Sequence, residues 1–363
     1  MTEPLVLITA GGTGGHVYPA LAVAEELLHR GYRVEWLGTR DGLESRVVPE
    51  AGIKLHYLPV RGLRGKSIWQ KLRAISVLGI AVLKAFWLVL IRRPACVLGL
   101  GGYVAGPAGV AAWVLRKPLV IHEQNSVAGT ANRMLAPLAD RVLAGFPEAF
   151  SEDRDVEVVG NPLREELVEA SDEAVYDYDG KRHFRLLVLG GSQGAAPINE
   201  VVPGAIQRLK RESDHVLEVF HQTGEEHIDD VRERYGELLE LGVEAEPYIE
   251  DMAGAYAWSD LVLCRGGALT VAEVALMGRP AVFVPLPQAI DNHQTHNARS
   301  LTDNGAGIMM NQAELDSYTL VKLLLECIDA PDALAQLAAA ARGLSNADAT
   351  LRVADVCEDV MHE

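Results

Sequence analysis

A glycine turn, an acidic helix residue and a polar loop follow one another between residues 261 and 298. Residues 261–264 read as a short buried strand, Arg265-Gly-Gly267 as a turn, and residues 268–277 as a helix that ends at Gly278. Such a turn aims free N–H groups and the positive end of a helix dipole at one point, which favours an anion such as phosphate. Glu273, one turn into the helix, is placed to accept hydrogen bonds from both hydroxyls of a ribose.

The loop that follows the next strand, residues 287–297, is dense in amide and imidazole side chains. Together with the glycine turn and Glu273, it indicates a nucleotide that bears a polar, sugar-like group. The alternative is an ordinary βαβ unit whose glycines serve only close packing, with Glu273 an exposed helix acid.

Composition limits the remaining possibilities. A chain of 363 residues exceeds one ordinary core and predicts two domains. Apolar residues make up 49% and charged residues 23%, as in soluble globular proteins. The net charge of −17 disfavours nucleic acid as a partner. The four cysteines show no C-x-x-C spacing and suit a reducing cytosol, and the polar start of the chain contains no recognisable signal peptide.

The first domain begins with a strand at residues 5–9, a glycine loop at 10–16 and a helix at 18–30. Its glycine spacing differs from G-x-G-x-x-G because Val17 occupies the position of the third glycine. The second strand ends in Gly38-Thr39 and not in an acid that could hold a ribose. Both facts argue against a nicotinamide site, although the loop still permits close approach of a phosphate or sugar.

Two more strands of this half start at residues 95 and 119. The first, 95–98, is followed by a glycine loop at 99–107, and the second, 119–121, ends in the polar residues 122–125. In an open α/β sheet, ligands bind beyond the carboxyl ends of the strands. The sequence therefore predicts a site at that edge of the first sheet.

A second domain starts after an acidic, linker-like stretch at residues 164–182. A strand at 184–189, a glycine loop at 190–194 and a helix at 197–209 repeat the arrangement at the beginning of the chain. Further strands are expected at 215–220, 281–284 and 307–310, and an alanine-rich helical region from residue 332. This repetition predicts an α/β protein with two Rossmann-like domains, residues 1–163 and 164–342.

Several separated motifs run along the chain: GGTGGHVYPALAVAEEL, WLGT, GLRGK, LGLGGYVAGPAG, HEQNSVAG, VVGNPLR, GGSQGA, DMAGAYAWSDLVLCRGGALTVAE and HQTHNA. In order and spacing they resemble those of the GT-B glycosyltransferases. More narrowly, they resemble the MurG family of peptidoglycan N-acetylglucosaminyltransferases, which convert lipid I to lipid II. The resemblance covers nearly the whole chain. The principal departure is Gly266, where the family pattern favours serine.

The resemblance implies two Rossmann-like domains whose parallel sheets face each other across a cleft, with a last helix, about residues 343–363, packed back on the first domain. It implies inverting transfer of GlcNAc from UDP-GlcNAc to the C4 hydroxyl of the muramyl sugar of undecaprenyl-diphosphate-linked MurNAc-pentapeptide, forming a β1,4 link. Two alternatives share the fold: a UDP-GlcNAc 2-epimerase, and a non-catalytic subunit that binds nucleotide sugars.

Matching to the family also implies roles for single residues. Ser192 and Arg164 would contact the diphosphate, Ile249 would present its backbone to uracil, and Glu273 would bind the ribose. The residues expected around GlcNAc are Ala268, Leu269, Thr270, Gln294 and Asn125. The remaining expected site residues are Thr13, Gly14, Gly15 and Val271 for substrate, and Gly101, Gly102 and Tyr103 on the acceptor side.

The transfer is expected to need no metal and no cofactor. Metal-dependent sugar transferases present a D-x-D at a strand end, whereas the two here, at 153–155 and 177–179, lie in linker-like sequence and read as surface acids. His16, after the first glycine loop, is the candidate base because an imidazole titrates near neutrality. A helix-capping role for His16 is the alternative, and His122 is the weaker candidate, expected to fix Asn125.

Charge is segregated along the chain, since residues 51–122 contain no Asp or Glu but many Lys and Arg. Within that span, residues 74–91 are almost entirely apolar. A transmembrane helix and a helix buried in the core are alternatives, but bases at both ends favour a helix lying on an anionic membrane surface. We therefore expect peripheral binding to the cytoplasmic face of the membrane, with contacts to other cell-wall enzymes left open. The expected membrane residues are Ile75, Leu78, Val82, Phe86, Trp113, Arg64 and Lys66.

Overall fold

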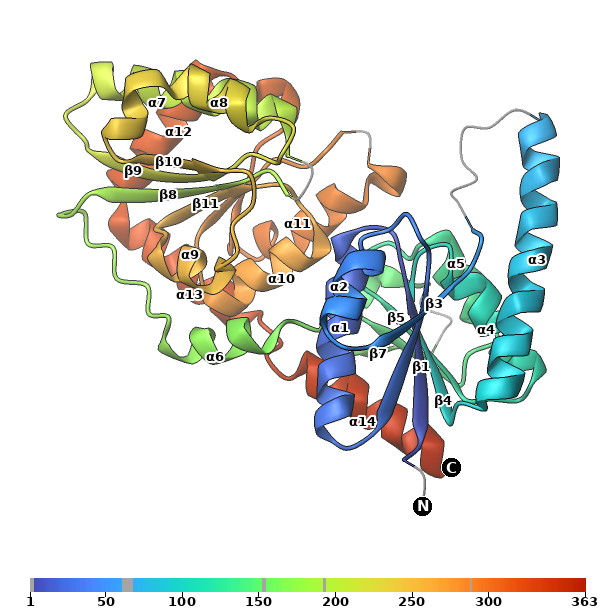
Figure 1. Cartoon of the computed structure of the whole chain (residues 1–363). Helices are drawn as coiled ribbons and strands as arrows, with labels where there is room; N and C mark the ends of the chain where they lie inside the picture. Colours follow the sequence, from blue (N-terminus) through green and yellow to red (C-terminus); the bar gives the residue numbers. More distant parts are fainter. Residues whose placement is uncertain (1–2, 61–67, 152–154, 192–193, 288) are drawn as a thin grey trace. The chain divides into compact units, whose positions relative to one another are not determined.

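The computed structural model describes residues 3–60, 68–151, 155–191, 194–287 and 289–363, with side chains throughout except at 68–76 and 290. The chain divides into two compact units (Figure 1). Unit 1 comprises Met1–Arg164 and Asn346–Glu363, and unit 2 comprises Glu165–Ser345. Arg164, which the sequence placed at the start of the second domain, is thus the last residue of the first segment of unit 1.

Unit 1 is built on a seven-stranded sheet whose paired strands are all parallel. In spatial order the strands are β3 (Lys54–Tyr57), β2 (Arg33–Gly38), β1 (Leu5–Ala10), β4 (Cys96–Gly101), β5 (Leu119–Glu123), β6 (Arg141–Ala144) and β7 (Glu157–Val158). The chain builds outward from β1 in one direction and then returns to add β4 on the other side. The strand order therefore reverses between the neighbouring strands β1 and β4, and the carboxyl ends of these strands form the topological switch point, where α/β sheets bind ligands.

Helices cover both faces of this sheet (Figure 1). Successive residues of β1 point to opposite faces. Val6 and Ile8 pack with α1 (Gly14–His29) and with the last helix, α14 (Ala349–His362), whereas Leu7 packs on the face covered by α3 (Ile68–Arg92) and α4 (Ala105–Val114). Two shorter helices, α2 (Glu44–Glu50) and α5 (Thr130–Leu135), flank β3 and α4. The end of the chain thus completes the core of unit 1.

Unit 2 contains a six-stranded parallel sheet. Its order is β10 (Val243–Glu246), β9 (Leu217–Gln222), β8 (Phe184–Leu189), β11 (Leu261–Cys264), β12 (Ala281–Phe283) and β13 (Ile308–Met309). The switch point lies between β8 and β11. Its helices are α6 (Glu165–Glu173), α7 (Ala196–Glu212), α8 (Ile228–Tyr235), α9 (Met252–Trp258), α10 (Ala268–Met277), α11 (His293–Thr302), α12 (Ser317–Ile328) and α13 (Pro331–Gly343).

The two parallel α/β sheets confirm the predicted fold class. Several element boundaries differ from the sequence expectation. α1 begins at Gly14 instead of residue 18, and the strands β4 and β5 continue to Gly101 and Glu123. His16 therefore lies in a helix and not in the glycine loop, and His122 lies inside β5, one residue before its end. The short strands β3, β6 and β10 were not predicted.

Candidate functional site

The switch point of unit 1 brings two glycine segments against His16, the third residue of α1. A Cβ on Gly101 would lie 3.0 Å from the His16 imidazole, and a Cβ on Gly102 would lie 2.3 Å from the carbonyl oxygen of Gly11. Both glycines also have positive φ, at 107° and 78°. Only glycine therefore lets the end of β4 and the following turn approach His16 and the first glycine loop this closely. Tyr103, next in the chain, is exposed.

His16 does not cap α1, so the capping alternative is wrong. The N-cap position belongs to Thr13, whose side chain makes no capping bond. The Nδ1 atom of His16 instead lies 2.7 Å from Oε1 of Gln124, just beyond the end of β5. Gly14 and Gly15 occupy the first two helical positions, where N–H groups have no partner within a helix.

Gln124 is held in turn by His122, a histidine with no solvent exposure. The Gln124 Nε2 atom lies 2.9 Å from Nδ1 of His122, and the other imidazole nitrogen of His122 lies 2.8 Å from the carbonyl oxygen of Gly160. Burial lowers the pKa of His122 to about 4. The sequence had suggested that His122 fixes Asn125, but in the structure it fixes Gln124. With this lowered pKa, His122 is neutral at pH 7.

Asn125 is held by Glu123, a buried carboxylate at the end of β5. Glu123 Oε1 accepts hydrogen bonds from the backbone N–H and the side-chain amide of Asn125, at 3.0 and 3.1 Å. Glu123 Oε2 accepts from the N–H of Gly129 and the amide of Asn132, both at 2.9 Å. Four donors compensate the buried charge and fix the position of the Asn125 backbone.

In unit 2 the N-terminus of α10 lies directly after β11, at the switch point. Gly267 is the N-cap residue, and Ala268, Leu269 and Thr270 form the first turn, whose N–H groups lack partners within the helix. Val271 differs from the other residues expected here. Its side chain is buried in the core and its N–H donates to the Gly267 carbonyl at 2.9 Å. We therefore assign Val271 to packing.

Glu273 is half-buried, so it is not the exposed helix acid of the alternative interpretation. Its Oε2 accepts a hydrogen bond from the hydroxyl of Tyr256, a fully buried residue of α9, at 2.9 Å. Tyr256 was not among the residues expected at the site. Ile249, which precedes α9, is buried, and its N–H donates to Oε1 of Gln222 at 3.0 Å. Because that N–H is already hydrogen-bonded, the backbone group of Ile249 that we expect to contact a nucleobase is its carbonyl.

The polar loop between β12 and α11 is tied to the glycine turn after β11. Gln294 Oε1 accepts from the N–H of Leu286 at 2.9 Å, and the amide of Asn297 donates to the carbonyl of Gly266 at 3.1 Å. A Cβ on Gly266 would lie 2.2 Å from the backbone oxygen of Gln294. Serine at position 266, which the family pattern favours, would therefore require the two segments to move apart.

Of the two residues expected at the diphosphate, the structure describes only Arg164. Ser192 lies outside the described residues. Arg164 belongs to unit 1, where its guanidinium lies over the Tyr18 ring, 5.7 Å from the ring centroid.

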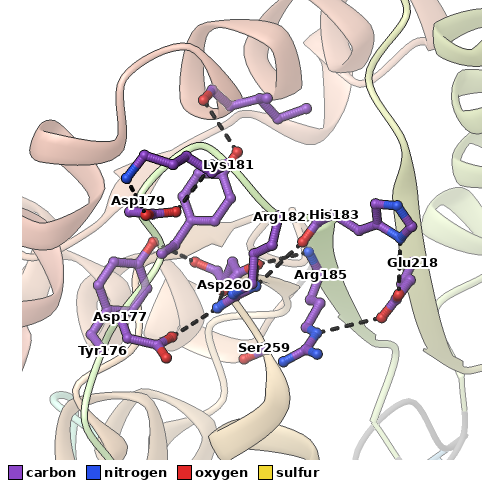
Figure 2. Close-up of polar contacts among 12 residues, drawn as sticks. Tyr176, Asp177, Asp179, Lys181, Arg182, His183, Arg185, Glu218, Ser259 and Asp260 are labelled. Atoms are coloured by element: carbon purple, nitrogen blue, oxygen red, sulfur yellow. Dashed lines mark hydrogen bonds and ion pairs between the residues drawn. The ribbon is translucent and has the colours of Figure 1, made fainter.

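Both carboxylates of the second D-x-D, at residues 177–179, form ion pairs with Arg or Lys side chains in the segment that leads into β8 (Figure 2). Asp177 pairs with Arg182 at 2.8 Å and Asp179 with Lys181 at 2.7 Å, and both carboxylates are largely exposed. Arg182 also forms two hydrogen bonds to the buried Asp260, at 2.6 and 2.7 Å. Among the residues that the structure describes, no group of three or more His, Cys, Asp or Glu side chains is arranged to hold a metal ion.

The apolar helix α3 places one face on the core and the other in solvent. Ala81, Ala85 and Val89 are fully buried. The opposite face exposes Leu83 (61%), Trp87 (58%) and Ile91 (70%), none of which is among the seven expected membrane residues. Of the expected membrane residues, Leu78 and Trp113 are exposed, Val82 is half-buried, and Phe86 is half-buried against the core. Arg64, Lys66 and the Ile75 side chain lie outside the described set. Within the described parts of the chain, none of the helices combines the length and apolar character needed to cross a bilayer.

Comparison with known proteins decides the family. The chain matches the glycosyltransferase family 28 N-terminal domain over residues 6–144 and the glycosyltransferase family 28 C-terminal domain over residues 185–353. It is 50% identical over 359 residues to the UDP-N-acetylglucosamine--N-acetylmuramyl-(pentapeptide) pyrophosphoryl-undecaprenol N-acetylglucosamine transferase of Stutzerimonas stutzeri, covering 98% of this chain and 99% of the relative. The chain belongs to glycosyltransferase family 28, in its MurG branch. The protein of the same description from Alkalilimnicola ehrlichii is 50% identical over 357 residues, with the same coverage.

Solved structures agree with this family 28 assignment. The crystal structure of MurG from Acinetobacter baumannii is similar with a TM-score of 0.83 and 36% identity, covering 98% of this chain and 100% of that one. The chain therefore has the GT-B fold of the MurG branch and is an N-acetylglucosamine transferase. The UDP-GlcNAc 2-epimerase of Neisseria meningitidis bound to UDP-GlcNAc matches with a TM-score of 0.67 but only 15% identity, over 98% of this chain and 99% of that one, which shows a shared fold alone.

Proposed function

We propose that this family 28 chain transfers GlcNAc from UDP-GlcNAc to the C4 hydroxyl of the MurNAc-pentapeptide of lipid I. The product is lipid II, with a β1,4 link, in peptidoglycan synthesis. Relatives named for the corresponding transfer are 50% identical across almost the entire chain. The observation that supports the chemistry most directly is the contact of 2.7 Å between His16 and Gln124 at the switch point of unit 1.

In this proposal unit 2 binds the donor. The Ile249 carbonyl accepts from uracil, Glu273 accepts from the ribose hydroxyls, and Gln294 lies beside GlcNAc. The diphosphate meets the N–H groups at the start of α10 and the glycine loop that contains Ser192. These donors stabilise the negative charge that builds on the leaving diphosphate, as a metal ion does in other transferases. The other residues of unit 2 assigned to GlcNAc are Ala268, Leu269 and Thr270.

Unit 1 binds the acceptor in the same proposal. The loop of Gly101, Gly102 and Tyr103 and the first turn of α1, with Thr13, Gly14 and Gly15, surround the reacting hydroxyl. His16 removes the proton from that hydroxyl as its oxygen attacks C1 of GlcNAc. The C1–O bond to the diphosphate breaks in the same displacement, so the configuration at C1 inverts and UDP leaves with the bonding electron pair.

Two assays separate this function from its rivals. With donor alone, a 2-epimerase would produce UDP-ManNAc, whereas the proposed transferase leaves UDP-GlcNAc unchanged apart from slow hydrolysis. With donor and a short-chain lipid I, a non-catalytic binding protein would bind UDP and release none by turnover. Formation of UDP-ManNAc, or the lack of any turnover with lipid I, would contradict the proposal.

We also infer that α3 and its neighbour α4 dock on the cytoplasmic face of the membrane, because the acceptor is attached to a lipid. The exposed side chains Leu83, Trp87, Ile91 and Trp113 supply apolar area at helices that pack against each other. Trp side chains favour the interface between lipid and water.

The ends of both helices support an anionic partner. Arg93 follows α3 with φ 51°, and Arg116 follows α4 with φ 52°. This left-handed conformation is common at helix ends, where glycine usually adopts it. For a residue with a Cβ it costs roughly 1–2 kcal/mol of conformational free energy. Both side chains are exposed. Arginine at two positions that favour glycine indicates that the charge itself is used, and anionic lipid is the partner that fits an adjoining apolar surface.

A further inference from the structure

We propose that Gln124, supported by His122, is a positioning residue that holds His16 in the tautomer with its proton on Nδ1. The Nε2 atom of His16 then carries the lone pair that faces substrate. This inference rests on the proposed role of His16 as the base, and it adds the group that prepares His16 for that role.

The orientation of the Gln124 amide is fixed by two contacts on one of its atoms. Its Nε2 lies 3.0 Å from the carbonyl oxygen of His122 and 2.9 Å from Nδ1 of the same residue. A carbonyl oxygen only accepts hydrogen bonds, so the amide atom beside it must be the NH2 group. The amide oxygen therefore points to Nδ1 of His16, at 2.7 Å. Because an amide oxygen only accepts, Nδ1 of His16 must carry a proton.

The hydrogen bond between His122 and Gly160 fixes the direction of the same series of hydrogen bonds independently. Nε2 of His122 lies 2.8 Å from the Gly160 carbonyl, which again only accepts, so Nε2 of His122 carries the proton. Its Nδ1 is then free to accept from Gln124. Burial lowers the pKa of His122 to about 4, so this ring stays neutral and keeps its single proton on Nε2 at the pH of the cytoplasm. Every hydrogen bond from Gly160 to His16 thus has one possible direction.

The surroundings hold this chain of groups in place. The backbone carbonyl of Gln124 accepts from the amide of Asn161 at 3.0 Å, and Gln124 and His122 are both fully buried. Gly160 has φ 87°, and a Cβ on it would lie 2.5 Å from the Cβ of Asn346. Its carbonyl direction therefore depends on glycine at this position.

This tautomer matters for the reaction. A free imidazole side chain favours the proton on Nε2, and a histidine in that form cannot accept a proton at Nε2. When Nε2 of His16 takes the proton of the attacking hydroxyl, Nδ1–H still donates to Gln124, so no bond has to rearrange. An amide gives this orientation without introducing a second charge beside the base. Which nitrogen of a histidine reacts is commonly set by the bond that the other nitrogen makes.

The tautomer can be measured directly by 15N NMR of the imidazole nitrogens in the whole protein at neutral pH. His16 and His122 are assigned by the signals lost in His16→Ala and His122→Asn. The expected result is opposite tautomers: His16 protonated on Nδ1 with an unprotonated Nε2, and His122 protonated on Nε2. A wild-type His16 with its proton on Nε2 would overturn the inference, whatever the activity of any variant.

Two substitutions test the cause. Gln124→Glu keeps an acceptor oxygen for His16 whether the carboxyl is charged or protonated, and should keep the Nδ1–H signal. Gln124→Met removes the acceptor and should shift His16 toward Nε2–H, lowering kcat by about 10- to 100-fold with the KM for UDP-GlcNAc changed less than about twofold. A merely structural Gln124 would change thermal stability in Gln124→Met but neither the tautomer nor kcat of the folded protein, and that result would refute the positioning role. Near-normal kcat in His16→Ala would instead contradict the proposed base, a failure that the NMR result does not depend on.

Discussion

The carboxylate of Glu44 accepts a hydrogen bond from the N–H of Gly12 at 3.0 Å, joining α2 to the first glycine loop across 32 residues of sequence. Its other oxygen accepts from the N–H and the hydroxyl of Thr39, at 2.8 and 2.7 Å. Glu44 is fully buried. One acid thus fixes the loops that follow β1 and β2, and His16 is the third residue of α1, the helix that follows the first of these loops.

Glu44→Gln should destabilise unit 1. Both oxygens face N–H donors, so the amide nitrogen of glutamine would oppose one of them and leave it without an acceptor. We expect a loss of about 1–3 kcal/mol and a lower kcat, because the loop that leads into α1 is released. Glu50→Gln, at the exposed end of the same helix, is the matched control. If thermal unfolding finds the two variants equally stable, Glu44 does not organise the loop.

Glu273→Gln should weaken recognition of the ribose in the donor. A carboxylate accepts from both the 2′ and 3′ hydroxyls, whereas an amide offers one acceptor oxygen, and Tyr256 already donates to this side chain at 2.9 Å. We expect UDP-GlcNAc binding to weaken by about 1–3 kcal/mol, and the preference over the 2′-deoxyribose analogue to shrink. Calorimetric titration with both donors measures this difference. An unchanged preference would remove Glu273 from ribose recognition.

Replacing Arg93 and Arg116 by glycine should separate membrane binding from folding. Glycine suits their left-handed backbone, so the double variant should be at least as stable as the wild type. Removing two charges should lower binding to anionic vesicles by roughly fivefold per charge, at about 1 kcal/mol each. The double variant Lys210→Gln and Arg211→Gln, exposed on α7 of unit 2, removes the same charge elsewhere. Equal vesicle binding by the two double variants would place the membrane surface elsewhere.

The apolar face of α3 has its own matched pair. Leu83 in unit 1 and Leu241 in unit 2 are exposed to similar extents, 61% and 53%. Leu83→Glu should abolish most co-sedimentation with vesicles, whereas Leu241→Glu should not, because only α3 is expected to enter the lipid interface. Loss of binding in both variants, or in neither, would contradict docking through α3.

The buried His122 predicts a specific dependence of stability on pH. Its pKa is about 4 in the folded protein and near 6.5 when unfolded, so the unfolded chain binds the extra proton between these values. The neutral, buried His122 therefore contributes to the free energy of unfolding fully above pH 6.5, and this contribution of about 3 kcal/mol is lost as pH falls to 4. His122→Asn should flatten the decline of the unfolding free energy over that window. The exposed His29→Asn is the control and should leave the decline unchanged.

Unfolding of unit 1 can be followed alone in a Trp258→Phe background. Trp258 belongs to unit 2, and the other four of the five tryptophans lie in unit 1. An equally steep decline in His122→Asn and His29→Asn would show that His122 does not titrate between the two states.

The sequence revealed most of the central strands, because parallel strands covered on both faces require nearly continuous apolar runs, as in β1, β8 and β11. It did not reveal β3 and β10, whose sequences KLHY and VEAE carry charges because they are edge strands. The position of α10 was predicted to the residue, since a glycine turn precedes it and Gly278 ends it in the left-handed conformation.

The candidate site was predicted less completely. His16 and Glu273 could be selected from residue type and place after a glycine turn. Their partners Gln124 and Tyr256 could not, because the contacts join positions 108 and 17 residues apart and depend on the tertiary fold. The polar run at 122–125 after a strand was the available signal for Gln124, and it was assigned to Asn125 instead.

The most direct test of the account is a reaction of the purified chain with UDP-GlcNAc and a short-chain lipid I, with the product isolated and its linkage determined by NMR. We expect one GlcNAc joined β1,4 to the muramyl sugar and one UDP released for each disaccharide. We also expect His16→Ala to slow product formation by about 10²- to 10⁴-fold with little change in UDP affinity. UDP release without a disaccharide, an α link, or near-normal turnover in His16→Ala would contradict it.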